Sequence, residues 1–140
     1  ITIFGENTKE DNPNILLVKE YEIPYTEDIN CLSWERLDGE HLLIGTDTSV
    51  TLLNLKFPRF ESQHVKGKVD TTTVWTVQTL PIKFIAFSPA SHLFMTFGQY
   101  DRCLKVWYFD YEDNTPKFVY LSHARSIVDA SWKEHNLKRC

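Results

Sequence analysis

Carboxylates and histidines are the side chains of this sequence whose types could support catalysis or metal binding. Asp47 and Asp101 each follow a short apolar segment and are the first candidates for acid–base work. An aspartate at a tight turn also caps backbone N–H groups, and we assign both residues to that structural role. Glu35, Asp38 and Glu40 flank another turn and are expected to form a solvated tip.

The five histidines raise the question of a metal site. They are His41, His64, His92, His123 and His135. None of them has the i, i+4 or His-x-His spacing of a zinc site, and no cysteine lies two to four residues from another cysteine. His41 and His92 stand just before corresponding predicted strands, which indicates a repeated structural feature. The sequence therefore predicts no metal and no cofactor.

Motifs for nucleophilic or phosphate chemistry do not occur in the sequence. There is no Gly-x-Ser-x-Gly elbow, no active-site cysteine context and no Gly-x-Gly-x-x-Gly or Walker-type loop. We therefore expect no enzymatic activity. A Ser/His/Asp triad assembles in space, so a hydrolase site on one face of the fold stays an open alternative.

Composition and charge narrow the class of protein. The 140 residues carry a net charge of −4, which argues against a nucleic-acid binder that relies on bulk positive charge. The hydrophobic fraction of 42% is that of a globular chain. The longest aliphatic run, 42–44, is far too short for a membrane helix. Cys31, Cys103 and Cys140 are odd in number and predict reduced thiols in the cytosol. Because the chain starts at Ile1, we interpret it as a piece of a longer protein.

Short β-strands are the elements that must position these side chains. Runs of β-branched and aromatic residues alternate with Gly, Asp, Asn and Pro, and no window has a helical period. The predicted strands are 1–4, 15–23, 30–34, 41–45, 50–55, 74–79, 83–87, 92–97, 103–108, 118–121 and 127–132. Segments 84–87 and 106–109 are apolar on both faces, which predicts that other sheets cover them on both sides.

Two landmarks recur along the chain. The first occurs three times, at 29–34, 82–87 and 127–132. The second occurs twice, at 47–53 and 101–107. Four strands in a unit of roughly 40–45 residues are typical of a β-propeller blade, and Gly-x-x-Asp-x-x-Leu-x-Val-Trp at 98–107 is a WD-repeat ending. The sequence thus predicts an all-β WD40-repeat β-propeller fragment of about three four-stranded antiparallel blades.

The repeats divide the whole chain, residues 1–140, into parts of one propeller. These are a partial blade over 1–23, a blade over 24–79 with an insertion at 56–73, a blade over 80–121 and the start of the next blade over 122–140. Closed propellers have about 4–8 blades, so such a fragment does not close alone.

Seven side chains are assigned to repeated structural positions. They are Asp47, Asp101, Trp107, His123, Trp34, Phe87 and Trp132. The aromatic stripe of Trp34, Phe87 and Trp132 is expected to pack between blades. Many WD blades also join a His, a Ser/Thr, an Asp and a Trp by hydrogen bonds.

This sequence departs from that set. The blade over 80–121 keeps its Asp and Trp but has Gln78 at the His position and Phe97 at the hydroxyl position. The blade over 24–79 has Leu53 in place of the Trp. We therefore expect apolar packing to hold these blades more than polar contacts do.

The insertion carries the basic patch of this chain that also contains aromatic residues. Lys56, Arg59, Lys66 and Lys68 make it a candidate partner-binding loop. A solvated loop is the simpler interpretation, because runs of charge usually face water. Without an amphipathic helix the patch falls short of a polybasic membrane anchor.

Several strings go beyond a generic propeller. They are 29–34 (INCLSW), 74–75 (VW), 105–108 (KVWY), 118–127 (FVYLSHARSI) and 131–133 (SWK). In order and spacing, over roughly 25–135, they resemble the DmX-like (rabconnectin) family, which includes the large subunit of the fungal RAVE complex. The stretch 118–133 is the most specific part of this resemblance.

The resemblance implies a very large cytosolic scaffold, peripheral on endosomal, vacuolar or vesicle membranes. It would promote assembly of the V1 sector of the vacuolar proton pump (V-ATPase) onto the Vo sector. V1-sector subunits and RAVE-type subunits would be its partners. The alternative is a generic WD-repeat adaptor for another complex, in ubiquitin ligation, vesicle traffic or Rab regulation.

Overall fold

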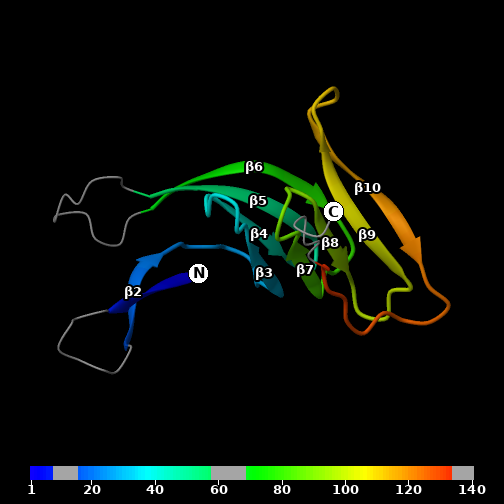
Figure 1. The fold of residues 1–140 in the computed structure, drawn as a ribbon, viewed down its shortest axis with the longest axis horizontal. Coiled ribbons are helices and arrows are strands. Elements are labelled where there is room, and N and C mark those ends of the chain that lie inside the picture. The colour runs from blue at the N-terminus through cyan, green and yellow to red at the C-terminus, as the bar shows by residue number, and fades with distance from the viewer. Residues whose placement is uncertain (8–15, 58–68, 134–140) are drawn as a thin grey trace, which may run out of the picture.

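Ten β-strands make up the regular structure in a computed structural model that describes residues 1–7, 16–57 and 69–133 (Figure 1). No helix occurs in these ranges. The strands are β1 (Thr2–Asn7), β2 (Leu16–Glu22), β3 (Cys31–Trp34), β4 (His41–Gly45), β5 (Ser49–Lys56), β6 (Asp70–Gln78), β7 (Phe84–Phe87), β8 (Phe94–Phe97), β9 (Cys103–Asp110) and β10 (Thr115–Ser122). The predicted all-β class is confirmed.

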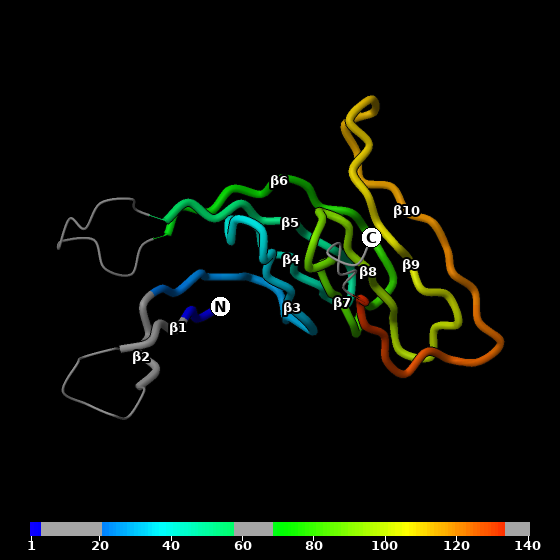
Figure 2. The backbone as a smooth tube through the Cα atoms, in the orientation of Figure 1, coloured from blue at the N-terminus to red at the C-terminus, as the bar shows by residue number. Residues whose placement is uncertain are grey.

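The strands form three antiparallel sheets. β1 pairs with β2, and two four-stranded sheets follow in the orders β3-β4-β5-β6 and β7-β8-β9-β10. Every strand pairs with its neighbour in the sequence. The four-stranded sheets meet along β3 and β7, which lie side by side (Figure 2). We call this junction the β3–β7 seam.

One predicted strand is wrong. Residues 127–132 form no strand, although they align in sequence with β3 and β7. A strand requires a neighbouring ladder, and the described residues place none beside this segment. It is instead attached by single contacts: the Ile127 backbone N–H donates to the Asp101 carbonyl at 2.7 Å, and Trp132 Nε1 donates to the Ala86 carbonyl at 3.1 Å.

The larger hydrophobic core lies between the two four-stranded sheets. Its buried side chains come from both sheets and from the segment that joins them: Leu43, Val50, Ile82, Ile85, Phe94 and Trp107. A second core covers the other face of β4 and β5. It contains Ile23, Leu42, Ile44, Leu53 and Leu55, with Ile1 and Ile3 packed against it. The two central strands of the first four-stranded sheet, β4 and β5, are therefore buried on both faces.

The second four-stranded sheet is covered less completely than its composition predicts. All four residues of β8 are buried, but β7 and β9 are mostly half-buried. On β9 Trp107 is buried while its neighbour Tyr108 is exposed. Segments 84–87 and 106–109, which lie in β7 and β9, were predicted to be covered on both sides, and that prediction is wrong for most of their residues. The strands that are buried on both sides are β4 and β8.

Most of the predicted insertion at 56–73 falls outside the described residues. Lys56 ends β5 and is exposed, whereas Arg59, Lys66 and Lys68 lie outside the described ranges. β6 begins at Asp70, four residues before the predicted strand. The same ranges leave out His64, His135 and Cys140, while Cys31 and Cys103 are free thiols.

Candidate functional site between the two sheets

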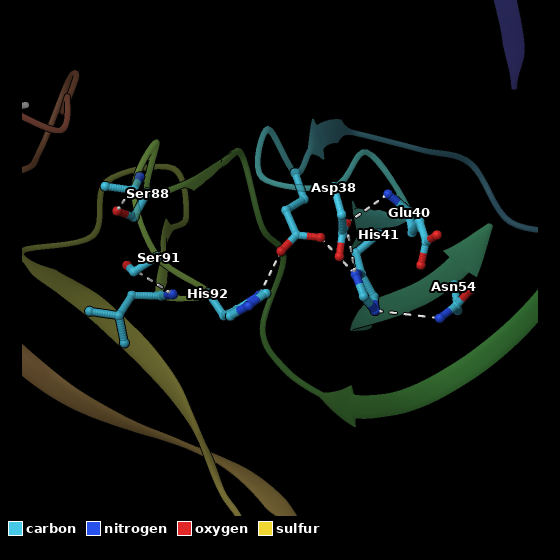
Figure 3. Close-up of polar contacts among 10 residues, drawn as sticks. Asp38, Glu40, His41, Asn54, Ser88, Ser91 and His92 are labelled. Atoms are coloured by element: carbon cyan, nitrogen blue, oxygen red, sulfur yellow. Dashed lines mark hydrogen bonds and ion pairs between the residues drawn. The ribbon is translucent and has the colours of Figure 1, made fainter. Parts of the chain in front are cut away.

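A buried carboxylate joins the two four-stranded sheets next to the β3–β7 seam. The Glu35 side chain, directly after β3, has no solvent exposure. Its Oε2 lies 2.6 Å from His41 Nδ1 at the start of β4, and its Oε1 lies 2.5 Å from His92 Nδ1 before β8. His41 and His92 therefore approach one carboxylate from different sheets (Figure 3).

The turn between β3 and β4 sets the position of Glu35. The Glu35 backbone N–H donates to the His41 carbonyl at 3.0 Å, which closes the hairpin. Within the turn Gly39 has a φ of 72°, a conformation that glycine adopts without steric cost. The Glu40 backbone N–H donates to Asp38 Oδ1 at 2.9 Å and is the main cause of a lowered Asp38 carboxyl pKa. The expected solvated tip is wrong for Glu35, because this hairpin bends its side chain inward.

The two imidazole rings contact Glu35 differently. His41 Nδ1 lies 2.6 Å from Oε2 in hydrogen-bond geometry. Among the described residues Oε1 has no hydrogen-bond partner, although His92 Nδ1 lies 2.5 Å away. His41 Nε2 lies 3.5 Å from the Asn54 side-chain nitrogen, which can donate to it. The cluster thus leaves one oxygen of a buried carboxyl group without a hydrogen bond.

Glu35, Asp38 and His41 place three metal-ligating atoms within 4.8 Å of one another. A tetrahedral zinc ion with bonds of about 2.0–2.1 Å would hold its ligand atoms roughly 3.3 Å apart. The 2.6 Å between His41 Nδ1 and Glu35 Oε2 is a hydrogen-bond distance and leaves no room for an ion between them. The arrangement is that of a hydrogen-bonded cluster. Residue spacing did not reveal it, because His92 arrives from the second sheet.

A cavity of about 230 Å³ opens beside this cluster, between the two sheets. We call it the aromatic cavity. Its lining consists of Glu35, His41, His92, Leu52, Val74, Trp75, Phe87, Phe94, Tyr108, Phe109, Tyr111 and Pro116. Its rings pack on one another: Trp75 and Phe94 are stacked with centroids 5.7 Å apart, and Phe109 meets Tyr111 edge to face at 5.0 Å. No lysine or arginine is among these lining residues of the described chain.

A larger and more open cavity, of about 720 Å³, lies on the seam. All three residues of the predicted aromatic stripe line it, together with Leu32, Arg36, Met95 and neighbouring residues. Phe87 packs against the main core, and Trp132 is half-buried. The expectation of packing between blades is wrong for Trp34, which is 41% exposed. Its Nε1 donates to the Gly39 carbonyl at 2.7 Å, which turns the ring toward its own hairpin.

Asp101 and Trp107 occupy the polar positions predicted for the second four-stranded sheet. Asp101 Oδ2 accepts a hydrogen bond of 2.7 Å from the Gly98 backbone N–H, so its predicted turn-capping role is confirmed. Trp107 is 1% exposed, and its Nε1 donates to Thr96 Oγ1 at 2.8 Å. The hydroxyl position is therefore held by Thr96 and not by Phe97. The sequence alignment was one residue out of register at this strand.

The corresponding turn in the first four-stranded sheet uses a different cap. Thr46 Oγ1 accepts from the backbone N–H groups of Thr48 and Ser49 at 3.2 and 3.0 Å. Asp47 instead accepts from the Asn30 side chain at 2.7 Å and is exposed. The predicted capping role of Asp47 is wrong, because the buried Thr46 hydroxyl, one residue earlier, accepts the hydrogen bonds from the backbone N–H groups of the turn. His123 is exposed, and its backbone N–H donates to the Arg102 carbonyl at 2.7 Å.

No protein-family model, curated protein or solved structure matches this chain. In the described ranges no helix has the length and apolar character that crossing a membrane requires.

Proposed function

We propose that this chain is part of a non-enzymatic WD-repeat scaffold that acts by binding other proteins. The observation that carries the proposal is the repetition of one architecture. Two consecutive antiparallel sheets have the same strand order, and each is closed at its central turn by a side-chain cap, from Thr46 in one and Asp101 in the other. The buried Trp107–Thr96 hydrogen bond adds a contact of the WD-repeat kind.

The faces of the sheets also support a propeller. The main core lies between two sheets that meet along their first strands, as successive blades do. On the last strand, β10, Val119, Tyr120 and Leu121 are each about half exposed or more. Val119 and Leu121 lie on one face of β10, and a further blade packed face to face on this sheet would cover them.

The specific task comes from the resemblance to the DmX-like family. A scaffold of that kind holds subunits of the vacuolar proton pump close together and raises their effective concentration for joining. Partners would be V1-sector and RAVE-type subunits, bound while the scaffold is peripheral on an endosomal, vacuolar or vesicle membrane. Loops on the faces of rigid blades would make the contacts.

Affinity capture of the tagged full-length parent protein, with the bound proteins identified by mass spectrometry, tests this proposal. We expect stoichiometric recovery of V1-sector subunits. Recovery of a different complex without pump subunits would contradict the assembly role and favour the adaptor alternative. A hydrolase role would require labelling of one Ser or Cys by a mechanism-based probe, with the label lost on mutation of that residue.

A further inference from the structure

We propose that the aromatic cavity is a binding site for a lysine side chain of a partner protein. That the lysine belongs to a protein rests on the proposed function. The cavity's preference for a primary ammonium group rests on its own lining residues.

An unpartnered buried oxygen is the first argument. Glu35 is fully buried, and among the described residues its Oε1 has no hydrogen-bond partner. A buried polar atom left without a donor is costly, and a ligand that donates to it removes that cost. Among the described residues that line this cavity there is no Lys or Arg, and the adjacent Arg36 lines the other one. An ammonium group that enters the cavity can therefore donate to this oxygen.

The lining is the second argument. Trp75, Phe87, Phe94, Tyr108, Phe109 and Tyr111 supply six aromatic rings. Ring faces attract an ammonium group, and rings also pack well along a chain of methylenes. The same chain already uses this interaction elsewhere, where Lys105 Nζ lies 4.7 Å from the Phe118 ring centroid.

Size and geometry select the ligand. The volume of about 230 Å³ is below the roughly 300–1,000 Å³ of pockets for drug-sized molecules, so it suits one side chain. An arginine pairs best with a carboxylate through two parallel hydrogen bonds. Glu35 Oε2 already accepts from His41 Nδ1, so among the described residues Oε1 alone is without a hydrogen-bond partner and a fork across both oxygens is disfavoured. A compact ammonium needs only one approach direction.

Isothermal titration calorimetry of the intact protein with n-butylammonium chloride, at constant ionic strength, tests the site. We expect saturable binding with one equivalent. Glu35→Gln should weaken this binding about tenfold or more, because it removes the charge and keeps the size. Glu40→Gln is the matched control: this neighbouring carboxylate is exposed, does not line the cavity and should leave binding unchanged.

A capped pentapeptide with a central lysine distinguishes the sources of the amine. It should bind at least as tightly as butylammonium, and its norleucine analogue should not bind. Equal binding of the norleucine peptide, tighter binding of an arginine peptide, or binding of butylammonium alone would overturn the proposal. Absence of binding by every amine probe would overturn it as well.

A variant at an exposed lining residue of the aromatic cavity tests the site even if Glu35→Gln does not fold. Tyr111 is 83% exposed and lines the cavity, so Tyr111→Ala should leave the fold intact and weaken binding about threefold. Tyr100→Ala, at a residue 77% exposed outside the lining, should have no effect. These titrations use no pump subunit, so their outcome is independent of whether V1-sector subunits are captured.

Discussion

Trp107 anchors the second four-stranded sheet from β9 through both its ring and its N–H group. The ring is stacked on Phe94 with centroids 5.6 Å apart and packs against Phe118 at 4.8 Å. The indole N–H is satisfied by Thr96, whose side chain has no solvent exposure. One residue therefore closes the apolar core and pairs a buried polar group that would otherwise be costly.

We expect Trp107→Ala to lower the free energy of unfolding by about 3–5 kcal/mol, because a large buried ring leaves a cavity. Thr96→Val should cost less, about 1–3 kcal/mol, because it keeps the volume and orphans the indole N–H. Asp101→Ala should cost about 1–2 kcal/mol as a lost turn cap. Urea denaturation of the intact protein measures all three. A Trp107→Ala loss below about 1 kcal/mol would contradict the assigned core position.

Cys31 gives a pH-dependent contribution to stability. Burial raises the pKa of its thiol from 9.0 to about 11. The folded state therefore holds the proton more tightly, so this contribution is fully present below pH 9 and is lost as pH rises through 11. Between pH 8 and pH 10.5 we expect the wild type to lose more stability than Cys31→Ala, with Cys103→Ala as the control. Parallel pH profiles for wild type and Cys31→Ala would contradict this.

The hairpin of β9 and β10 is longer than the strands predicted for it. The predicted strands ended at residue 108 and resumed at 118, but β9 continues to Asp110 and β10 begins at Thr115. Lys117 Nζ binds Asp110 at 2.6 Å and also binds Asp113, and Lys117 lowers the Asp110 carboxyl pKa. Asn114 takes the positive φ that the turn needs. Asp110 and Lys117 are polar residues of the kind found in loops, but here they form an ion pair between β9 and β10. Composition alone does not show that two such residues face each other across a hairpin.

Gly45 on β4 lies against β3 and against the segment that leads into β7. A Cβ atom at this position would lie 2.6 Å from Cys31 Sγ and 2.9 Å from Ile82 Cγ2. We expect Gly45→Ala to destabilise the protein by about 1–3 kcal/mol through overpacking. The double variant Gly45→Ala/Cys31→Ala should recover part of the loss, since the sulfur is removed. Thermal unfolding of the two variants measures the coupling, and strict additivity would contradict the contact.

At the scale of the molecule, polar contacts fix how the two sheets meet. The Phe87 backbone N–H donates to Ser33 Oγ at 2.8 Å, and the Ile82 backbone N–H donates to the Thr46 carbonyl at 3.0 Å. Glu35 and His92 add the contact between the two β-hairpin turns. Repeat alignment located both sheets, because their strand patterns lie within the local sequence. It could not locate Glu35 beside His92 or Thr96 beside Trp107, because those pairs depend on side-chain direction and sheet packing.

His92→Ala should weaken the junction without disturbing either sheet. It removes the 2.5 Å contact between His92 Nδ1 and Glu35 Oε1, a loss of about 1 kcal/mol because the His92 side chain is mostly exposed. His123→Ala, at an exposed histidine away from Glu35, is the matched control. Chemical denaturation measures the difference between the two variants. Equal small losses would show that the Glu35–His92 contact contributes nothing to holding the sheets together.

The strand order has a consequence for how the chain reaches this structure. Every ladder joins strands that are consecutive in the sequence, so each sheet can form as a series of hairpins. The contacts that join the sheets span far more of the chain, as in the 54 residues between Ser33 and Phe87. Sheets built from local contacts are expected to form first and the seam between them last. On a ribosome, the first four-stranded sheet would be complete before the second had emerged, and docking would be the slow step.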